Sequence, residues 1–334
     1  MGRGTRSQGA GNRPAIYLSI ILATAGSAFL YELRTKGVFA CDGAGYDESH
    51  YLSYCNSIGY GDYDHGALWF GLEADALEAA AEADVLFLGS SRMQFAFSTD
   101  ATRDWFSGRD WNYFLLGFSH NGNAKFLGPL LESMNPRAAA YVINVDRFFE
   151  ERESEPVAYI FHTEDADSRY RTKQIWQIPH ELLCKRFSLL CGGERSYFRD
   201  NRNGSWKFYS NEPRILEMVA DADPQSSASI DHEIDMARDF VDSLPVDRKC
   251  IFLTVAPSTA TPRSLANAIA ASLEMDLTAP SRPEFRTFDG SHLDELSAQS
   301  WSYDFLALIG NKLDSCVRES RRRRPDSLPL ESTE

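Results

Sequence analysis

The chain has 334 residues, of which 43% are hydrophobic and 25% charged, a composition typical of a globular protein and not of an intrinsically disordered one. This length suits one large domain with additions, or two small domains. The formal net charge of −14 disfavours a nucleic-acid partner, because phosphate backbones attract basic surfaces.

The N-terminus predicts a membrane segment. Residues 15–31 carry no charge, and the only charged side chains before them are basic: Arg3, Arg6 and Arg13. The positive-inside rule then places residues 1–14 in the cytoplasm as a basic leader, residues 15–31 in the membrane and the rest outside the cytoplasm, on the periplasmic side. A buried core helix and a cleaved signal peptide are the alternatives, the latter because Ala23-Thr24-Ala25 has a small-x-small pattern. An uncleaved single-pass anchor is favoured, since apolar residues continue to Tyr31.

Six cysteines suit an exported protein. Two short loops predict the disulfides Cys41–Cys55 and Cys184–Cys191, although six cysteines allow many pairings. Cys250 lies in an apolar run, where a buried free thiol is the default, and Cys316 is either free or its partner. There is no Cys-x-x-Cys motif, so the sequence predicts no zinc ribbon and no thioredoxin-type site.

Residues 71–317 predict a doubly wound α/β domain with a parallel sheet. Short apolar runs that suit buried parallel strands alternate with helix-like stretches. The expected strands cover 84–89, 111–116, 138–145, 249–255 and 284–288; the expected helices cover 71–83, 121–134, 264–273 and 294–316.

Three segments break this alternation. Residues 32–70 are rich in glycine, aspartate and tyrosine, and predict an irregular exported segment; their acidic part, residues 42–48, lacks the spacing of a calcium loop. Residues 148–224 predict an aromatic-rich insertion or lid, whose aromatics serve either as core or as sugar-stacking surfaces, with core favoured for any single one. These aromatics are Trp176, Phe187, Tyr197, Phe198, Trp206, Phe208 and Tyr209. Residues 318–334, with five arginines and two prolines, predict a disordered tail.

Polar residues gather just after the predicted strands. Ligands of open α/β sheets bind beyond the carboxyl ends of the strands, so these residues are expected at one rim. They are Gly89, Ser90, Ser91, Gly117, Asn121, Asn123, Asp146, Asp289 and His292. Serine, histidine, aspartate, glycine and amide side chains together are the components of a site for acyl transfer.

The order of these motifs resembles the SGNH, or GDSL-like, hydrolase superfamily. The matching blocks are Gly89-Ser90-Ser91, then Gly117, then Asp289-Gly290-Ser291-His292. Ser90 replaces the aspartate that usually precedes the nucleophile. This replacement is typical of a membrane-anchored branch that includes proteins of alginate O-acetylation and teichoic acid D-alanylation. The resemblance implies a flavodoxin-like sheet.

The resemblance also implies the role of each residue. Ser91 is the expected nucleophile, His292 its base and Asp289 the orienting carboxylate. The N–H groups of Ser91 and Gly117 are expected to bind the oxyanion. The third donor is open: the family has an asparagine where this chain reads Asn144-Val145-Asp146-Arg147, so Asp146 fits only if protonated, and Asn121 and Asn123 are alternatives.

The sequence therefore predicts an exported serine esterase or O-acyltransferase, acting on a cell-envelope or exported polysaccharide, with acetyl as the expected acyl group. The branch it resembles implies an integral-membrane acyl donor as a partner. No cofactor or metal is expected. The alternative is a non-catalytic module that binds polysaccharide or an assembly partner, which the departure at Asp146 favours. The absence of a GxSxG motif argues against an α/β-hydrolase, and the sequence has no Walker or GxGxxG motif.

Overall fold

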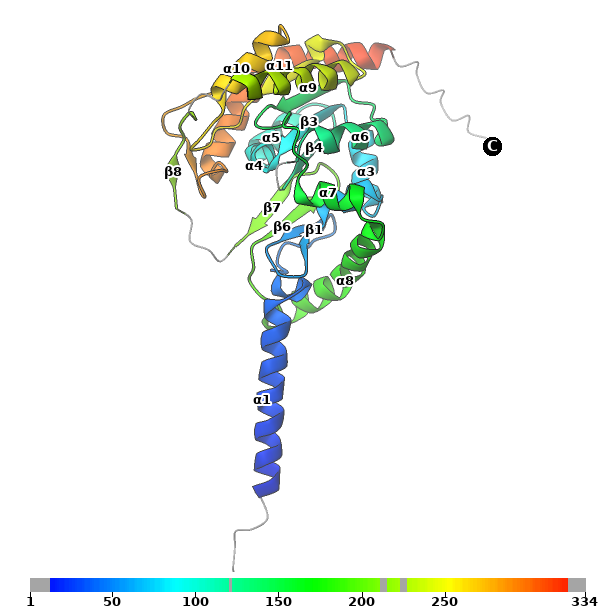
Figure 1. Ribbon diagram of the computed structural model, residues 1–334, viewed down its shortest axis with the longest axis vertical. Helices are drawn as coiled ribbons and strands as arrows, with labels where there is room; N and C mark the ends of the chain where they lie inside the picture. Colours follow the sequence, from blue (N-terminus) through cyan, green and yellow to red (C-terminus); the bar gives the residue numbers. More distant parts are fainter. Residues whose placement is uncertain (1–12, 120–121, 211–214, 223–226, 324–334) are drawn as a thin grey trace, which may run out of the picture.

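A single N-terminal helix projects from a folded body (Figure 1). The computed structural model describes residues 13–119, 122–210, 215–222 and 227–323. Helix α1 (Arg13–Thr35) is apolar and long enough to cross a membrane, and none of its apolar stretch is buried in the body. This excludes the core-helix alternative, whereas an anchor and a signal sequence both fit. Arg3 and Arg6 of the basic leader lie outside the described residues.

The body contains a four-stranded parallel sheet in the order β4-β3-β5-β9, which confirms the mixed α/β class. Its strands are β3 (Val85–Ser90), β4 (Tyr113–Phe118), β5 (Ala140–Asn144) and β9 (Ile251–Thr254). Successive side chains of a strand point to opposite faces. Leu86 and Leu88 accordingly enter one hydrophobic core, and Val85 and Phe87 enter the other. Burial on both faces explains why these strands read as continuous apolar runs.

Helices cover both faces of this sheet. One core receives α3 (Ala74–Ala81), α6 (Ala124–Met134), α9 (Ser227–Ser243) and α10 (Arg263–Ser272). The other core receives α4 (Ser91–Phe97), α5 (Asp100–Ser107) and α11 (Glu295–Arg323). Helix α11 is longer than predicted, and its Arg321 forms an ion pair with Asp84 at 2.9 Å. The predicted tail is therefore wrong for residues 318–323, while residues 324–334 lie outside the described part.

The prediction that residues 284–288 form a fifth strand of the main sheet is wrong. The segment contributes only β10 (Arg286–Thr287), which pairs antiparallel with β8 (Glu217–Met218) in a separate two-stranded sheet. Thr287 is buried but Arg286 is exposed. A strand with one solvated face suits a small peripheral sheet, not the interior of a parallel one.

A second, antiparallel sheet joins the two segments that were predicted to be irregular or inserted. Its order is β2-β1-β6-β7, with β2 (Gly61–Asp62), β1 (His50–Cys55), β6 (Ser196–Asp200) and β7 (Trp206–Tyr209). Residues 32–70 are thus not irregular, and 148–224 is not a separate lid. The remaining elements are η1 (Val38–Ala40), α2 (Asp64–Trp69), α7 (Glu155–His162), α8 (Ala166–Arg186), η2 (Ser188–Leu190) and η3 (Arg248–Cys250).

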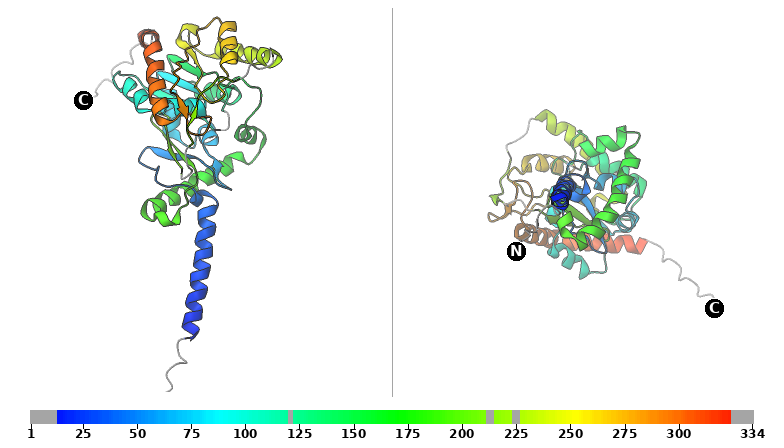
Figure 2. Two further views of the ribbon diagram at one scale, coloured as in Figure 1. Left: turned by 90° about the vertical axis from the view of Figure 1, so that its left-hand side faces the viewer. Right: turned by 90° about the horizontal axis from the view of Figure 1, so that it is seen from below.

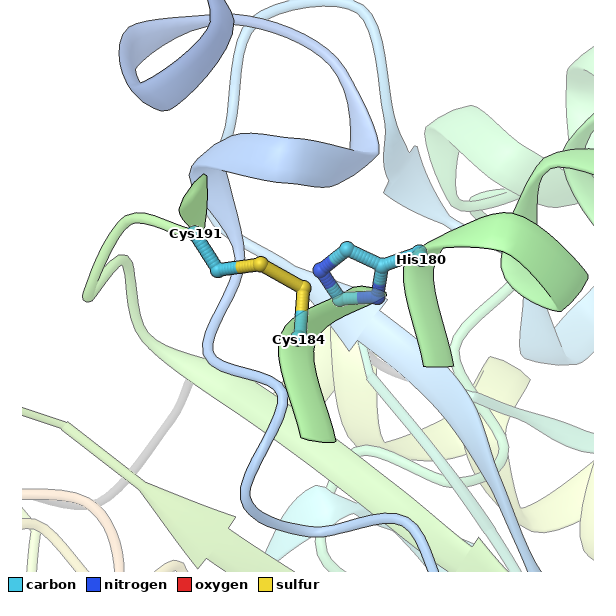
Figure 3. Close-up of side chains that lie close together, drawn as sticks. All are labelled: His180, Cys184 and Cys191. Carbon is cyan, nitrogen blue, oxygen red and sulfur yellow. A yellow bond between two sulfur atoms is a disulfide. The ribbon is translucent and has the colours of Figure 1, made fainter. Parts of the chain in front are cut away.

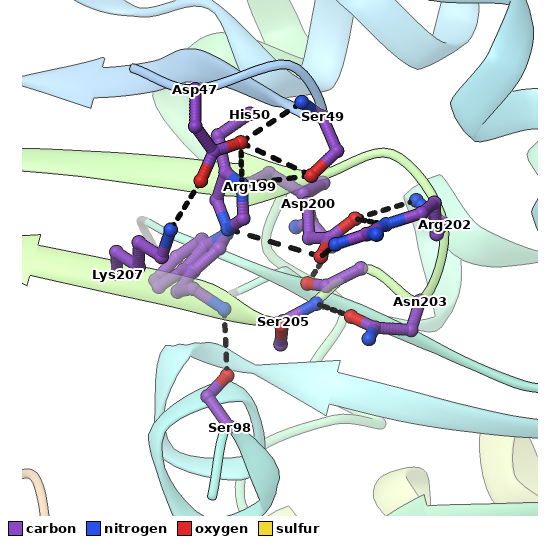
Figure 4. A network of polar contacts seen from close by, with 12 residues as sticks. Asp47, Ser49, His50, Ser98, Arg199, Asp200, Arg202, Asn203, Ser205 and Lys207 are labelled. Carbon is purple, nitrogen blue, oxygen red and sulfur yellow. Dashed lines mark hydrogen bonds and ion pairs between the residues drawn. The ribbon is translucent and has the colours of Figure 1, made fainter. Parts of the chain in front are cut away.

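Arg199 of β6 fastens the second sheet to the main one. Its guanidinium is fully buried, pairs with Asp64 and donates to the carbonyl oxygens of Leu115 and Gly117 in β4. Figure 4 shows the polar network beside Arg199, in which Asp47 contacts His50 and Lys207, and Asp200 contacts Arg202. The Trp206 N–H donates to Ser98 Oγ at 2.8 Å. Removing one partner of a buried ion pair lowers the free energy of unfolding by roughly 3–5 kcal/mol. The contacts of Arg199 therefore hold the second sheet firmly against β4 of the main sheet.

All six cysteines form disulfides. Cys41–Cys55 and Cys184–Cys191 are confirmed. The default of a free thiol at Cys250 is wrong: Cys250 pairs with Cys316, with a Cα–Cα distance of 5.7 Å, because α11 packs against η3 at the start of β9. Three disulfides favour an oxidising, exported compartment.

Candidate functional site

The two serines at the end of β3 differ in role: Ser90 is the last residue of the strand and Ser91 follows it. Ser90 is buried and caps α4, since its Oγ accepts a hydrogen bond from the Arg92 N–H at 3.3 Å. Ser91 is the first residue of α4 and is half-buried. The amides of a first helical turn have no intrahelical acceptor, so the N–H of Ser91 is suited to donate outward. Ser91 is thus left partly exposed, whereas Ser90 caps the N-terminus of α4.

The structure brings Ser91, His292 and Asp289 into one hydrogen-bonded chain. Ser91 Oγ lies 2.8 Å from His292 Nε2, and His292 Nδ1 lies 2.8 Å from Asp289 Oδ2. In the arrangement that serves catalysis, Nδ1–H donates to Asp289 and Nε2 accepts the Ser91 proton. The predicted triad residues therefore meet with the geometry that a serine nucleophile requires.

The Asp289 carboxylate is held by the turn that carries it. Its Oδ1 accepts from the N–H groups of Ser291 and His292, at 3.0 and 2.9 Å. Gly290, with φ of 78°, provides the left-handed residue that this turn needs. Partial burial alone would raise the pKa of Asp289, but the hydrogen bonds from His292 and from these two N–H groups bring the pKa below its ordinary value. The carboxylate is thus kept ionised beside the histidine.

Aromatic rings surround the His292 imidazole. The ring centroids of Phe95 and Phe288 lie 4.6 and 5.7 Å from that of His292, and Phe288 is stacked on the imidazole. Phe208 of β7 stacks in turn on Phe288 at 5.3 Å. The insertion therefore supplies part of the wall next to the triad. Tyr197, Phe198 and Trp206 are buried as core, while Phe208 and Tyr209 are half-buried.

Asp146 lies near the triad but in a different role from the one considered. Arg92 bridges the site: its Nη1 donates to Asp146 Oδ1 at 2.7 Å and its Nε donates to Ser291 Oγ at 3.0 Å. Burial raises the pKa of Asp146, and the Arg92 charge opposes that rise. Asp146 is thus an acceptor for Arg92, which connects the nucleophile helix to the Asp289–His292 turn.

Gly117 does not present a free donor. Its N–H donates to Gln94 Oε1 at 3.1 Å. A Cβ at this position would lie 2.7 Å from Gln94 Cβ and 2.9 Å from Met93 Cε, so glycine is required for the close packing of α4 on β4. These contacts argue against the predicted oxyanion role of Gly117 and explain the residue as a packing site.

Of the two amide side chains named as alternatives, the structure describes only that of Asn123, and it serves another role. The Asn123 amide donates to the carbonyl oxygens of Glu150 and Arg152, at 3.3 and 2.7 Å, and so holds that loop. Asn121 lies outside the described residues.

Asn144 is the residue that sequence analysis passed over. It ends β5, is fully buried, and its Oδ1 accepts from the Ala256 N–H at 2.8 Å. Its Nδ2 has no hydrogen-bond partner among the described residues. A Cβ on Gly89 would lie 3.0 Å from Asn144 Cβ, so this unused amide lies beside the strand that leads to Ser91. A buried donor without a partner needs an explanation, and a role toward a ligand or reacting group is one.

Gly122 marks another close approach at this rim. A Cβ there would lie 2.6 Å from Phe118 Cβ and 3.3 Å from the Gly89 carbonyl oxygen. Only a residue without a side chain brings its backbone so near the end of β3. In the sequence, Gly122 lies directly between Asn121 and Asn123, the two residues considered as donors there.

One cluster away from the triad has the residue types of a metal site. His180, Cys184 and Cys191 have their donor atoms within 4.8 Å of one another (Figure 3). The two sulfur atoms form a disulfide, so neither is available as a thiolate ligand. His180 Nδ1 pairs with the Tyr46 hydroxyl at 3.0 Å, and burial lowers the pKa of His180 to about 4. The cluster is therefore explained as a packed disulfide with a neutral histidine.

Comparison of the chain with known protein families, with curated proteins and with solved structures gave no match. The functional argument therefore depends on the motifs and on the geometry of the site.

Proposed function

We propose that the protein is a serine hydrolase or O-acyltransferase in which Ser91, His292 and Asp289 carry the chemistry. The observation that supports this most strongly is the unbroken chain of two 2.8 Å contacts from Ser91 Oγ through His292 to Asp289. The resemblance of the motifs to SGNH hydrolases, with their flavodoxin-like sheet, supports the same proposal. The parallel sheet with Ser91 at the end of β3 is compatible with it.

The mechanism follows from the contacts. Ser91 Oγ attacks the carbonyl carbon of an ester while its proton passes to His292 Nε2, and Asp289 stabilises the imidazolium. The oxyanion is bound by the N–H of Ser91, by Asn144 Nδ2 and by the N–H of Gly122. His292 then gives its proton to the leaving alcohol, and the acyl group remains on Ser91. Water or a sugar hydroxyl, deprotonated by His292, takes the acyl group and frees the serine.

We propose an acylated glycan of the cell envelope, or an exported polysaccharide, as substrate. Aromatic rings at His292 offer apolar faces against which a sugar ring can pack. The resemblance to the membrane-anchored branch suggests acetyl as the acyl group and an integral-membrane protein as acyl donor. The Arg92–Asp146 pair would hold the nucleophile helix and the His292 turn in register during the reaction.

In this proposal α1 anchors the catalytic body on the outer side of the cytoplasmic membrane. The disulfides and the exposed apolar helix support export. A reporter fused after Leu33 should be active only outside the cytoplasm, and the purified protein should retain residues before Ala25. A cytoplasmic reporter signal would overturn export, and loss of the first residues would show a cleaved signal.

Activity can be tested with an activated acetyl ester and with acetylated glycans. Ser91→Ala and His292→Ala should abolish release of the acetyl group, while the matched Ser90→Ala should retain activity and lose only about 1 kcal/mol of stability, as for a helix cap. Equal loss in Ser90→Ala and Ser91→Ala would contradict the assignment of the nucleophile.

A non-catalytic glycan-binding module is the second candidate. The engagement of the Gly117 N–H by Gln94 favours it, because one expected oxyanion donor is occupied. This candidate predicts that glycans bind while no ester is cleaved and Ser91→Ala binds like the unmodified protein.

A further inference from the structure

A row of large apolar side chains is exposed on α8 and on the short helix that follows it. We call this set the basal patch. Its members, each between 53% and 70% exposed, are Ile175, Trp176, Ile178, Leu182, Phe187 and Leu189. Soluble proteins rarely leave so many large apolar side chains exposed in one contiguous segment, and such a surface indicates a partner or a membrane.

Helix α8 has two apolar faces, and only one is used by the fold. Tyr170, Gln177 and Cys184 belong to the buried face, at the spacing of a helix that packs on a core. Ile175, Ile178 and Leu182 lie on the opposite side, at the spacing i, i+3, i+7. Core packing therefore cannot explain the second face.

The exposed residues of α8 change character along the helix. In its first half the exposed positions are polar or charged: Ser168, Arg169, Arg171 and Thr172. The apolar exposed positions begin at Ile175 and continue through η2. This change is expected of a helix that contacts an apolar phase, such as a membrane, at only one of its ends.

The apolar end of α8 is the end that lies next to α1. Figure 1 shows α8 descending to the junction between the body and α1, and the view from below in Figure 2 shows the same neighbourhood. Leu33 and Lys36 at the end of α1 line one surface pocket together with Arg169, Thr172 and Trp176 of α8. The patch thus lies where the uncharged run of α1 ends.

The position of the patch relative to α1 is fixed by the backbone. After η2, the Gly192 N–H donates to the Phe39 carbonyl oxygen at 2.7 Å, and the Glu194 N–H donates to that of Ala40 at 3.0 Å. A Cβ on Gly192 would lie 2.6 Å from the Arg34 carbonyl oxygen, so the chain passes close to the last turn of α1. The Cys184–Cys191 disulfide ties η2 back to α8.

Basic residues accompany the apolar ones. Lys185 and Arg186 end α8 and are exposed, and Lys36 follows α1. Lys185 pairs with Glu181 and Lys36 with Glu32, both on the surface, where such pairs are weak and open to exchange. Apolar side chains next to lysine and arginine, with a tryptophan at the level where a membrane helix ends, are the features of a segment that lies in the headgroup region. Basic side chains there favour anionic lipids.

We propose that the basal patch lies in the headgroup region of the bilayer that α1 crosses and binds anionic lipid. The proposal depends on α1 remaining in the mature protein as an anchor, but it does not depend on the hydrolase assignment. With two points of attachment, the body cannot rotate freely about the end of α1. The second sheet then faces the membrane, and the triad is held at a fixed orientation above it.

The test uses the full chain in vesicles of phosphatidylcholine with a minority of phosphatidylglycerol. A spin label is attached at Leu182→Cys in the patch and, as matched control, at Ser168→Cys, an exposed position of the same helix in its polar half. Both sites are on the surface, so neither label disturbs packing. Non-reducing peptide mapping verifies that the native disulfides are intact.

The Leu182 label should be relaxed by oxygen, which concentrates in lipid, and protected from a water-soluble nickel chelate; the Ser168 label should show the reverse. Omitting phosphatidylglycerol should make the Leu182 label more accessible to nickel. A label at Ile21→Cys in α1 reports the anchor. If the Ile21 label is in lipid while the Leu182 label is as accessible to nickel as the Ser168 label, the membrane is not the partner, and the proposal is wrong. If the Ile21 label is in water, α1 is not a membrane anchor, and the proposal fails because it requires that anchor.

Discussion

Replacing Asn144 by alanine tests whether its unpartnered amide serves the reaction. Nδ2 is buried beside the end of β3 and has no acceptor among the described residues. If it binds the oxyanion, its removal should cost roughly 3–4 kcal/mol of transition-state stabilisation, or about 10²–10³ in kcat. Asn144→Ala also removes the acceptor of the Ala256 N–H, which should lower the free energy of unfolding by roughly 1–3 kcal/mol.

The two effects are separated by measuring ester hydrolysis and thermal unfolding on the same samples. Thr254→Val is the matched control, since Thr254 is paired with Asn144 in the sheet, is buried, and has an Oγ1 without a partner among the described residues. That variant should keep its rate. If Asn144→Ala hydrolyses the ester as fast as Thr254→Val at a temperature where both are folded, Asn144 is not an oxyanion donor and the reasoning from its unpartnered amide fails.

Three further predictions concern the triad, the pH dependence and the disulfides. Asp289→Asn should leave the protein folded and reduce kcat by roughly 10⁴-fold, because His292 loses the acceptor that fixes its tautomer; unchanged kcat would remove Asp289 from the triad. Burial raises the pKa of Glu73 to about 7, although the Tyr63 hydroxyl donates to it, so the folded state holds this proton more tightly than the unfolded state. Stability is then lost as pH rises from about 4.5 through 7. Glu73→Gln should therefore raise the free energy of unfolding by up to about 3 kcal/mol at pH 8 but little at pH 4. Thermal melts that show the same effect of Glu73→Gln at both pH values would contradict the raised pKa. Replacing Cys250–Cys316 by alanines should cost about 4 kcal/mol and replacing Cys184–Cys191 about 2 kcal/mol, because their sequence separations are 66 and 7; melting curves with the reverse order would show that loop entropy does not dominate.

The main sheet and the triad could be predicted because their signals are local. Strand β3 is apolar at successive positions and ends at Ser90, directly before Ser91, and Asp289 and His292 stand three residues apart in one turn. A buried parallel strand and a short turn both leave their mark within a few residues of sequence. Chain order then suffices to bring such blocks to one rim of the sheet.

The second sheet could not be predicted, because its pairing is between distant segments. Leu52 of β1 lies opposite Phe198 of β6, and no local pattern in either segment specifies the other. The buried Arg199 that joins this sheet to β4 looks in the sequence like any charged residue of an insertion. A separation of 66 residues likewise left the pairing of Cys250 with Cys316 as one alternative beside a free thiol.

The contacts of the expected oxyanion donors could not be predicted from the sequence, because strand register decides which side chains meet. Asn144 still belongs to β5 and lies beside Gly89, whereas Asp146 is past the strand end and pairs with Arg92. Asn144, whose amide N–H group has no partner among the described residues, and Asp146, which accepts from Arg92, are thus only two positions apart. Likewise, Gly117 is explained by the approach of Gln94, which belongs to another element. Such distinctions require the positions of neighbouring strands and helices.

The central claim is that Ser91 is an activated nucleophile, and covalent labelling tests it most directly. The full chain, purified in detergent, is treated with a fluorophosphonate, and the modified residue is located by peptide mass spectrometry. The account predicts one labelled site, Ser91, with labelling lost in Ser91→Ala and His292→Ala and kept in Ser90→Ala. Labelling of Ser90 in its place, or a folded protein in which Ser91 stays unmodified although the probe reaches the pocket, would contradict it.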